Sequence, residues 1–167
     1  MKQSLKIYLA GSVPKGDRET KNFMNWRLEY ADVIRKVIPN AEFIDPFERG
    51  DFDESDFMAV FGADCRHIKN CDLVVINGED RLGVGTSQEL VIAKYFKKPV
   101  ITILPKDTHH RRSNLEFRGQ IIEDWIHPFI FAFSDLILEK TDDLNKVDLQ
   151  KIKPKDISII DQSILKI

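Results

Sequence analysis

Long hydrophobic runs and an excess of charge of one sign are both missing from this sequence, and each absence excludes a class of protein. No apolar run approaches the roughly 20 residues that a membrane-spanning helix needs, and residues 1–10 lack the apolar core and cleavage site of a secretory signal. The chain has 25 Lys and Arg against 27 Asp and Glu, so it lacks the positive field of a nucleic-acid binder. We therefore expect a cytoplasmic protein that binds a small molecule and contacts neither a membrane nor a nucleic-acid polymer.

Cysteine and the common nucleotide-binding signatures are also scarce. Cys65 and Cys71 are the only cysteines, and no second Cys or His pair accompanies them at metal-ligand spacing. We expect free thiols, with no disulfide and no zinc. The chain has no Gly-Lys-Ser/Thr of a P-loop, and Gly83 and Gly85 give only Gly-x-Gly, because Gln88 stands in the place of the third glycine of a dinucleotide fingerprint.

The length of 167 residues and the mass of 19.4 kDa are sufficient for a conventional core. A chain of this mass buries about 70% of its surface on folding, without the help of disulfides or metals. No composition shift, repeat or low-complexity linker marks a second domain, so we expect one domain over residues 1–150. Residues 151–167 mix lysine with isoleucine, and we expect them to form either an edge strand or an arm on a neighbouring subunit.

Short β-rich segments alternate with longer helical patterns along the chain. The β-rich segments span 6–10, 42–44, 73–76, 100–104 and 136–138, and the helical patterns span 19–37, 55–70, 86–96 and 114–131, with a short helix after Thr141. This alternation predicts an α/β fold: a Rossmann-like, five-stranded parallel sheet with helices on both faces, in a flavodoxin-like three-layer sandwich. Ligands of such sheets bind beyond the carboxyl ends of the strands, so the loops that follow the strands form the expected binding edge.

Two acidic residues occupy helix positions where apolar residues are expected. Asp64 lies on the apolar stripe of the 55–70 helix, whose other members are Phe57, Val60, Phe61 and Ile68. Glu89 heads the apolar stripe of the 86–96 helix, which continues with Ile92, Ala93 and Phe96. An ionised carboxylate is costly to bury without partners, so both residues indicate a polar cavity or paired charges. Two facing carboxylates, one nucleophilic and one supporting, are what cleavage at a sugar anomeric carbon requires.

Each acid also has a purely structural interpretation. Residues 86–89 fit a Ser/Thr-x-x-Glu capping box, in which Glu89 would bond back to the backbone N–H of the first residue. Asp64 could form an ion pair with Arg66, with Lys69 or with a neighbouring helix. The pattern alone leaves the catalytic and the structural interpretations open.

Three loops at the expected binding edge have the composition of an anion site. Residues 11–18 supply backbone N–H groups, a hydroxyl and two cations after the first strand. Residues 82–86 lead directly into a helix and aim its positive end at a ligand. Residues 105–113 are rich in basic side chains and contain adjacent histidines. The first and third loops are candidate phosphate sites, whereas the second can pass close to a ligand; the alternative for the first is an ordinary loop with solvated charges.

Motifs spread over residues 6–119 follow the order of a known family. They are Ile-Tyr-Leu-Ala-Gly-Ser at 7–12, Asp64 eight residues before Asp72, Leu-Gly-Val-Gly at 82–85, Gly-Thr-Ser-Gln-Glu at 85–89, and Ser113 followed by Arg118-Gly119. In order and spacing these motifs resemble the nucleoside 2-deoxyribosyltransferase superfamily. Within it, the chain is more similar to the 2'-deoxynucleoside 5'-phosphate N-hydrolases than to the transferases.

The resemblance implies catalytic and inter-subunit roles. It assigns Glu89 as the nucleophile that attacks the anomeric carbon and expels the base. It assigns Asp64 as the acid that contacts the sugar or protonates the leaving base. A serine that a neighbouring subunit donates to the 5'-phosphate matches Ser113, so the resemblance implies a homodimer or a higher homo-oligomer.

The resemblance also implies a set of substrate-binding residues, with two departures from the family pattern. Tyr8, Gly11 and Ser12 match positions that line the ribose and phosphate end of the site. Gly83 and Gly85 match positions in the loop that precedes the catalytic glutamate. Gly83 stands where the family often carries an aspartate, which puts the handling of the base in question. Arg81 stands where the phosphate hydrolases have a serine, and it would either replace that serine as a phosphate ligand or face solvent.

Together these features predict an N-glycosidase that cleaves a nucleoside or deoxynucleoside 5'-monophosphate through a glutamate nucleophile. We expect no metal and no organic cofactor, because the base is the leaving group and water accepts the sugar. The alternatives are a deoxyribosyltransferase that exchanges bases, a phosphoribohydrolase whose Pro-Gly-Gly is missing here, and a non-catalytic nucleotide-binding sensor.

Overall fold

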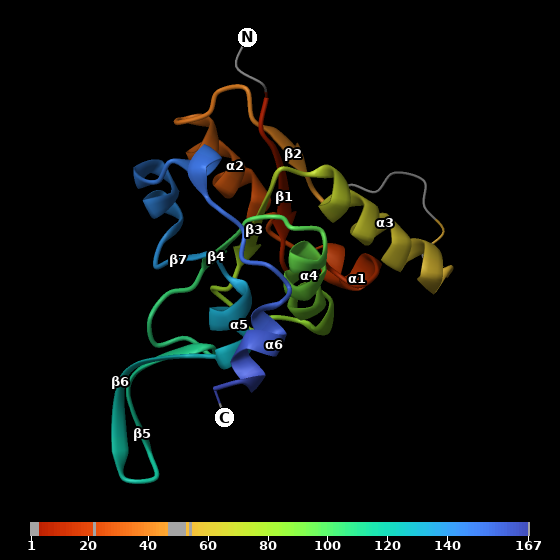
Figure 1. Ribbon diagram of the computed structural model, residues 1–167. Coiled ribbons are helices and arrows are strands. Elements are labelled where there is room, and N and C mark those ends of the chain that lie inside the picture. Colours follow the sequence, from red (N-terminus) through yellow and green to blue (C-terminus); the bar gives the residue numbers. More distant parts are fainter. Residues whose placement is uncertain (1–3, 22, 47–52, 54, 167) are drawn as a thin grey trace.

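A five-stranded parallel sheet forms the centre of the protein. The computed structural model describes residues 4–21, 23–46, 53 and 55–166 (Figure 1). The strands are β1 (Lys6–Ala10), β2 (Glu42–Ile44), β3 (Leu73–Asn77), β4 (Val100–Ile103) and β7 (Leu136–Leu138). Their order is β2-β1-β3-β4-β7, and every neighbouring pair is parallel. The predicted sheet, and the position of each strand in the sequence, are therefore confirmed.

Helices cover both faces of this sheet (Figure 1). The helices are α1 (Asp17–Thr20), α2 (Arg27–Arg35), α3 (Phe57–Asn70), α4 (Val84–Tyr95), α5 (Pro128–Phe133) and α6 (Ile159–Ile164), with 3₁₀ turns η1 (Thr141–Lys146) and η2 (Leu149–Lys151). Side chains of β1 alternate between two cores, because successive residues of a strand point to opposite faces. Ile7 and Leu9 pack with α2 and η1, whereas Tyr8 and Ala10 pack with α3, α4 and α5. The three-layer sandwich is confirmed.

The strand order creates a switch point between β1 and β3. From β1 the chain continues to β2 on one side, and β3 pairs with β1 on the other. In open α/β sheets the crevice for ligands lies at such a point, beyond the carboxyl ends of the strands. Residues 11–18 follow β1 and residues 78–83 follow β3, so the fold brings two of the predicted loops to this crevice.

Two helical segments differ from the sequence prediction. The 19–37 pattern forms the separate helices α1 and α2. The 114–131 pattern was predicted as a helix, and this prediction is wrong. It forms most of an antiparallel hairpin of β5 (Arg111–Phe117) and β6 (Gln120–Ile126), followed by the short α5. The hairpin projects from the body of the protein as a two-stranded ribbon (Figure 1).

The apolar stripe of α3 is buried over only part of its length. Ile68 is fully buried, but Phe57 is 80% and Phe61 52% exposed, so the predicted burial of the whole stripe is wrong. The described part of the tail, up to residue 166, carries α6 and no strand. Cys65 and Cys71 are free thiols. Among the described residues, no helix combines the length and apolar character needed to cross a bilayer.

Candidate active site

A hydrogen bond between Tyr8 and Glu89 joins the central sheet to α4. The phenol of Tyr8 donates to Oε1 of Glu89 across 2.6 Å. Tyr8 is fully buried, and Glu89 is only 9% exposed. This length is typical of an O–H donor that bonds to an ionised carboxylate, which is among the stronger hydrogen bonds in proteins. The bond fixes the orientation of the Glu89 carboxylate relative to β1.

Asp64 lies close to this pair from the side of α3. Burial is the largest cause that raises the pKa of Tyr8, and the negative charges of Glu89 and Asp64 raise it further. The same two charges, after burial, raise the pKa of the Cys65 thiol. One turn after Asp64, the ring of His67 stacks on that of Tyr8 with centroids 6.3 Å apart. The structure therefore brings Tyr8, Asp64 and Glu89 into one cluster.

The local structure of α4 excludes the capping-box interpretation of Glu89. The helix begins at Val84, and Gly83 is its N-cap without a side-chain cap bond. Thr86 is already inside the helix, so it cannot be the N-cap of the capping box that residues 86–89 predicted. Glu89 instead reaches across to β1, where it accepts the bond from Tyr8.

Arg27, which the sequence did not predict as a functional residue, positions the loop that follows β1. Its guanidinium is 2% exposed and donates to the carbonyls of Leu9, Gly11 and Ser12 at 2.9–3.2 Å. Its Nε also lies 3.1 Å from Oδ1 of Asp45, just after β2. The positive charge of Arg27 acts to lower the pKa of Tyr8, against the larger effects that raise it. No sequence signal distinguishes this arginine from a solvated one at the start of a helix.

The loop after β1 passes tightly over an aromatic side chain. A Cβ on Gly11 would lie 2.5 Å from Cζ2 of Trp26, so only glycine fits there. The next residue, Ser12, is exposed and lines a cavity of about 630 Å³ together with Val13, Pro14, Arg18, Glu19 and Phe23. The cavity therefore offers a hydroxyl, a guanidinium and the Glu19 carboxylate after the carboxyl end of β1.

The loop between β3 and α4 is held at both of its ends. Oε1 of Glu79 accepts hydrogen bonds from Tyr30 at 3.1 Å and from Thr141 at 3.2 Å. At the other end, the N–H of Leu82 donates to Nε2 of His110 at 2.9 Å. Arg81 lies between these two anchors and is exposed. Gly83 and Gly85 are exposed too, with open space where a Cβ would be, so close packing does not demand glycine at either position.

Ser113 and the basic loop bond to other parts of the chain. Ser113 is on β5 of the projecting hairpin, where its N–H donates to Asp107 at 2.9 Å. Arg111 makes a two-pronged ion pair with Asp124, and its guanidinium also donates to the carbonyl of Leu104. Since Arg111 and the buried His110 are engaged within the chain, the candidate phosphate loop at 105–113 has fewer groups available than its composition suggested.

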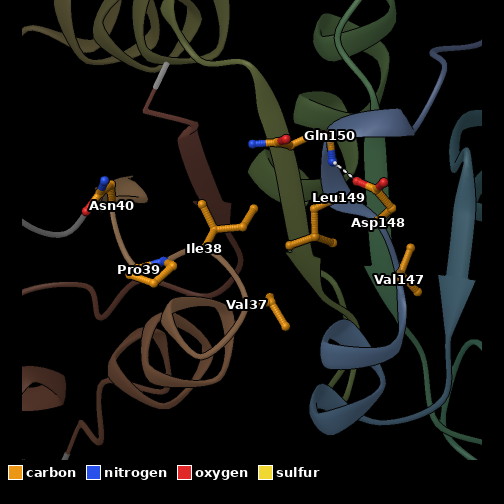
Figure 2. Close-up of a pocket in the computed structure, with 8 residues that line it drawn as sticks. All are labelled: Val37, Ile38, Pro39, Asn40, Val147, Asp148, Leu149 and Gln150. Carbon is orange, nitrogen blue, oxygen red and sulfur yellow. Dashed lines mark hydrogen bonds between the residues drawn. The ribbon is translucent and has the colours of Figure 1, made fainter. Parts of the chain in front are cut away.

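A second hollow lies at the opposite edge of the sheet. Figure 2 shows it between the segment after α2 and the η1–η2 region, where its walls are residues 37–40 and 147–150. Residues 37–40 precede β2, so this hollow is at the amino edge, away from the crevice where ligands of parallel sheets bind. Within the described ranges, no group of three or more His, Cys, Asp or Glu side chains could hold a metal.

Comparison with known proteins places this geometry in a known fold. No protein-family model and no curated protein matches the sequence. Among solved structures, a 2-deoxyribosyltransferase from the psychrotolerant bacterium Bacillus psychrosaccharolyticus aligns with a TM-score of 0.57 and 23% identity, over 90% of this chain and 98% of that chain. This chain has the 2-deoxyribosyltransferase-like fold.

Two further structures align with this chain. A conserved protein from Enterococcus faecalis V583 aligns with a TM-score of 0.59 and 19% identity, over 86% of this chain and 96% of that one. A CMP N-glycosidase from Clostridium botulinum aligns with a TM-score of 0.45 and 21% identity, over 86% and 99% of the two chains. The 2-deoxyribosyltransferase-like fold, predicted from the motifs, is confirmed by the architecture shared with the 2-deoxyribosyltransferase.

Proposed function

We propose that this protein is an N-glycosidase that cleaves the bond between base and sugar in a nucleoside or deoxynucleoside 5'-monophosphate. The observation that carries the proposal is the Tyr8–Glu89 hydrogen bond, which fixes a nearly buried carboxylate, with Asp64 close enough for its charge to act on the same Tyr8. A carboxylate in this setting meets two requirements of a nucleophile, namely a fixed orientation and shelter from bulk water.

In the first step, Glu89 attacks the anomeric carbon of the sugar. Tyr8 holds Oε1, so we assign the attack to Oε2. The new bond joins Oε2 to the anomeric carbon, and the bond from that carbon to the base nitrogen breaks. The electron pair leaves with the base, which takes up a proton from Asp64 or from water. The product is a glycosyl ester of Glu89 and a free base.

In the second step, water resolves the ester. Its oxygen bonds to the anomeric carbon, the bond to Glu89 breaks, and the carboxylate returns to its ionised form while a proton passes to a nearby base. In the cavity after β1, the Ser12 hydroxyl and the Arg18 guanidinium can donate hydrogen bonds to a phosphate dianion, while the Glu19 carboxylate on the same lining accepts from the N–H of Lys15. Arg81 is a further candidate ligand, since it is exposed on the loop before α4.

Ser113 belongs to this proposal through a second subunit. Its position on the projecting hairpin supports the assignment that the family resemblance implies, namely a contact with the phosphate bound by a neighbouring copy. We therefore propose a homodimer or a higher homo-oligomer as the active form.

Base exchange is the second candidate activity. The fold is shared with a protein named as a 2-deoxyribosyltransferase, and a transferase would share the first step and differ only in the acceptor. Incubation of a deoxynucleoside with a second free base separates the two activities, because only a transferase produces the new nucleoside.

The test of the proposal is the release of free base from a panel of nucleosides and nucleotides, followed by chromatography. We expect Glu89→Gln to lose about a thousandfold or more in rate, because it removes the nucleophile. We expect Asp64→Asn to lose about 10²–10⁴-fold, the range of general acid–base assistance. Glu42→Gln is the matched control, since Glu42 is an exposed carboxylate at the amino end of β2.

Two results would contradict this function. One is a Glu89→Gln protein that releases base at the rate of the parent. The other is a parent protein that binds nucleotides but turns over none of them, which is the behaviour of a nucleotide sensor.

A further inference from the structure

The imidazole of His110 contacts the backbone at the entry to α4, the helix that carries Glu89. Its Nε2 accepts the N–H of Leu82 at 2.9 Å, so the ring is neutral and its proton is on Nδ1. Leu82 immediately precedes Gly83, the N-cap of α4. The carbonyl of Gly83 in turn accepts both the N–H and the hydroxyl of Ser87, at 3.0 and 2.9 Å. His110 therefore anchors the backbone at Leu82, one residue before the N-cap whose carbonyl accepts from the first turn of α4.

Hydrogen bonds to two neighbouring segments hold His110 in place. Its carbonyl accepts the N–H of His127 at 2.8 Å, at the junction of β6 and α5. The next residue, Arg111, donates to the carbonyl of Leu104, directly after β4. The ring is 9% exposed, and its Nδ1 is buried without a hydrogen-bond partner among the described residues. The ring that accepts from Leu82 is therefore held by elements outside the loop between β3 and α4.

The groups that face this ring disfavour a positive charge. His109 and His127 lie on either side, with ring centroids 4.6 and 5.6 Å from that of His110, and both rings are nearly perpendicular to it. Arg81 faces it from the loop between β3 and α4. Burial is the largest cause that lowers the pKa of His110, and these three cationic or titratable neighbours lower it further. Within the part of the chain that the structure describes, no carboxylate is among the groups that shift the pKa of this ring.

We infer that His110 is a positioning residue that sets the start of α4, and that protonation of its Nε2 releases this anchor. A protonated imidazole has N–H donors at both nitrogens and cannot accept from Leu82. Two donors would then face each other across the same 2.9 Å, and the Arg81–Gly83 segment must move away. For catalysis the inference rests on the proposed function, because the displaced segment leads into the helix that presents Glu89 to Tyr8.

The test compares two substitutions by the exchange rate and the pH titration of the Leu82 amide, measured by NMR without substrate. In the parent, we expect a protected amide whose chemical shift follows the ionisation of His110. His110→Gln keeps a side-chain oxygen that can accept the bond but cannot titrate, so the amide should stay protected while its pH response disappears. His110→Phe removes the acceptor, and exchange should accelerate on the order of tenfold. His109→Gln is the matched control, because its exposed ring does not bond to Leu82.

The outcomes separate this inference from the proposed function. It is overturned if the Leu82 amide is as protected in His110→Phe as in the parent, or if the amide still titrates with the same midpoint in His110→Gln. If base release is found, the rate of base release should fall less on acidification in His110→Gln than in the parent. The same fall in both proteins would overturn the catalytic part of the inference. If no base release is found but the amide responds as expected, the anchor stands and the proposed function fails.

Discussion

Gly11 lies against the ring of Trp26 with no room for a side chain. We expect Gly11→Ala to destabilise the protein by about 1–3 kcal/mol, because the added methyl must displace the ring or the loop after β1. Gly62→Ala is the matched control: Gly62 is exposed in the interior of α3 and meets nothing within 4 Å, so alanine should stabilise by about 0.5–1 kcal/mol. Denaturant titration of both variants measures the two changes, and equal signs would contradict the packing argument.

At the same scale, the sequence predicted the acids better than their surroundings. Asp64 and Glu89 were recognisable because each interrupts an apolar stripe, and Tyr8 and Glu89 do meet. The resemblance implies that Tyr8 lines the sugar end of the site, and that assignment stays a prediction; the sequence did not predict the bond of its hydroxyl to Glu89. Arg27 was not predictable, because its three carbonyl partners lie at the end of β1 and in the loop that follows it, which only the tertiary fold brings next to α2.

Among the elements, the β5–β6 hairpin is the clearest test of local backbone preference. Two residues join its last pair, Phe117 and Gln120, and both have positive φ, 51° at Arg118 and 76° at Gly119. Two-residue hairpin turns favour this conformation, and Asn-Gly favours it most. We expect Gly119→Ala to accelerate amide exchange near the turn several-fold, because the positive φ destabilises alanine there by about 1 kcal/mol or more. Arg118→Asn, the opposite control, should slow exchange.

The global unfolding midpoint should change little in either hairpin variant, because β5 and β6 contact chiefly each other. A fall in the midpoint as large as that of Gly11→Ala would show that the ribbon is integral to the core.

The sequence of this hairpin also explains why it was predicted as a helix. Its apolar residues fit a helical spacing, and the Arg-Gly turn that divides them is weaker as a sequence signal than Asn-Gly. The parallel strands were easier to predict, since burial on both faces demands continuous apolar runs.

Over the whole molecule, Asp135 connects segments that are far apart in the sequence. Its Oδ2 accepts from Lys94 of α4 and from the N–H of Val100 in β4, and its Oδ1 accepts from the N–H of Lys155. The ammonium of Lys155 donates to the carbonyl of Ser134 at 2.6 Å and to those of Phe131 and Ala132. The C-terminal segment is therefore attached to the sheet and to the end of α5, and the same carboxylate anchors the helix that carries Glu89.

This arrangement predicts that Lys94→Met destabilises every part of the protein together. Lys94 and Asp135 are buried, and removal of one member of a buried ion pair costs about 3–5 kcal/mol because the remaining charge loses its partner. Lys146→Met is the matched control, since the Lys146–Asp143 pair is formed by an exposed ammonium and should matter little. Circular dichroism and tryptophan fluorescence should report one shared, lowered midpoint for Lys94→Met. If only fluorescence changed, or if both variants lost equal stability, Asp135 would not be the link that joins α4, the sheet and the C-terminal segment.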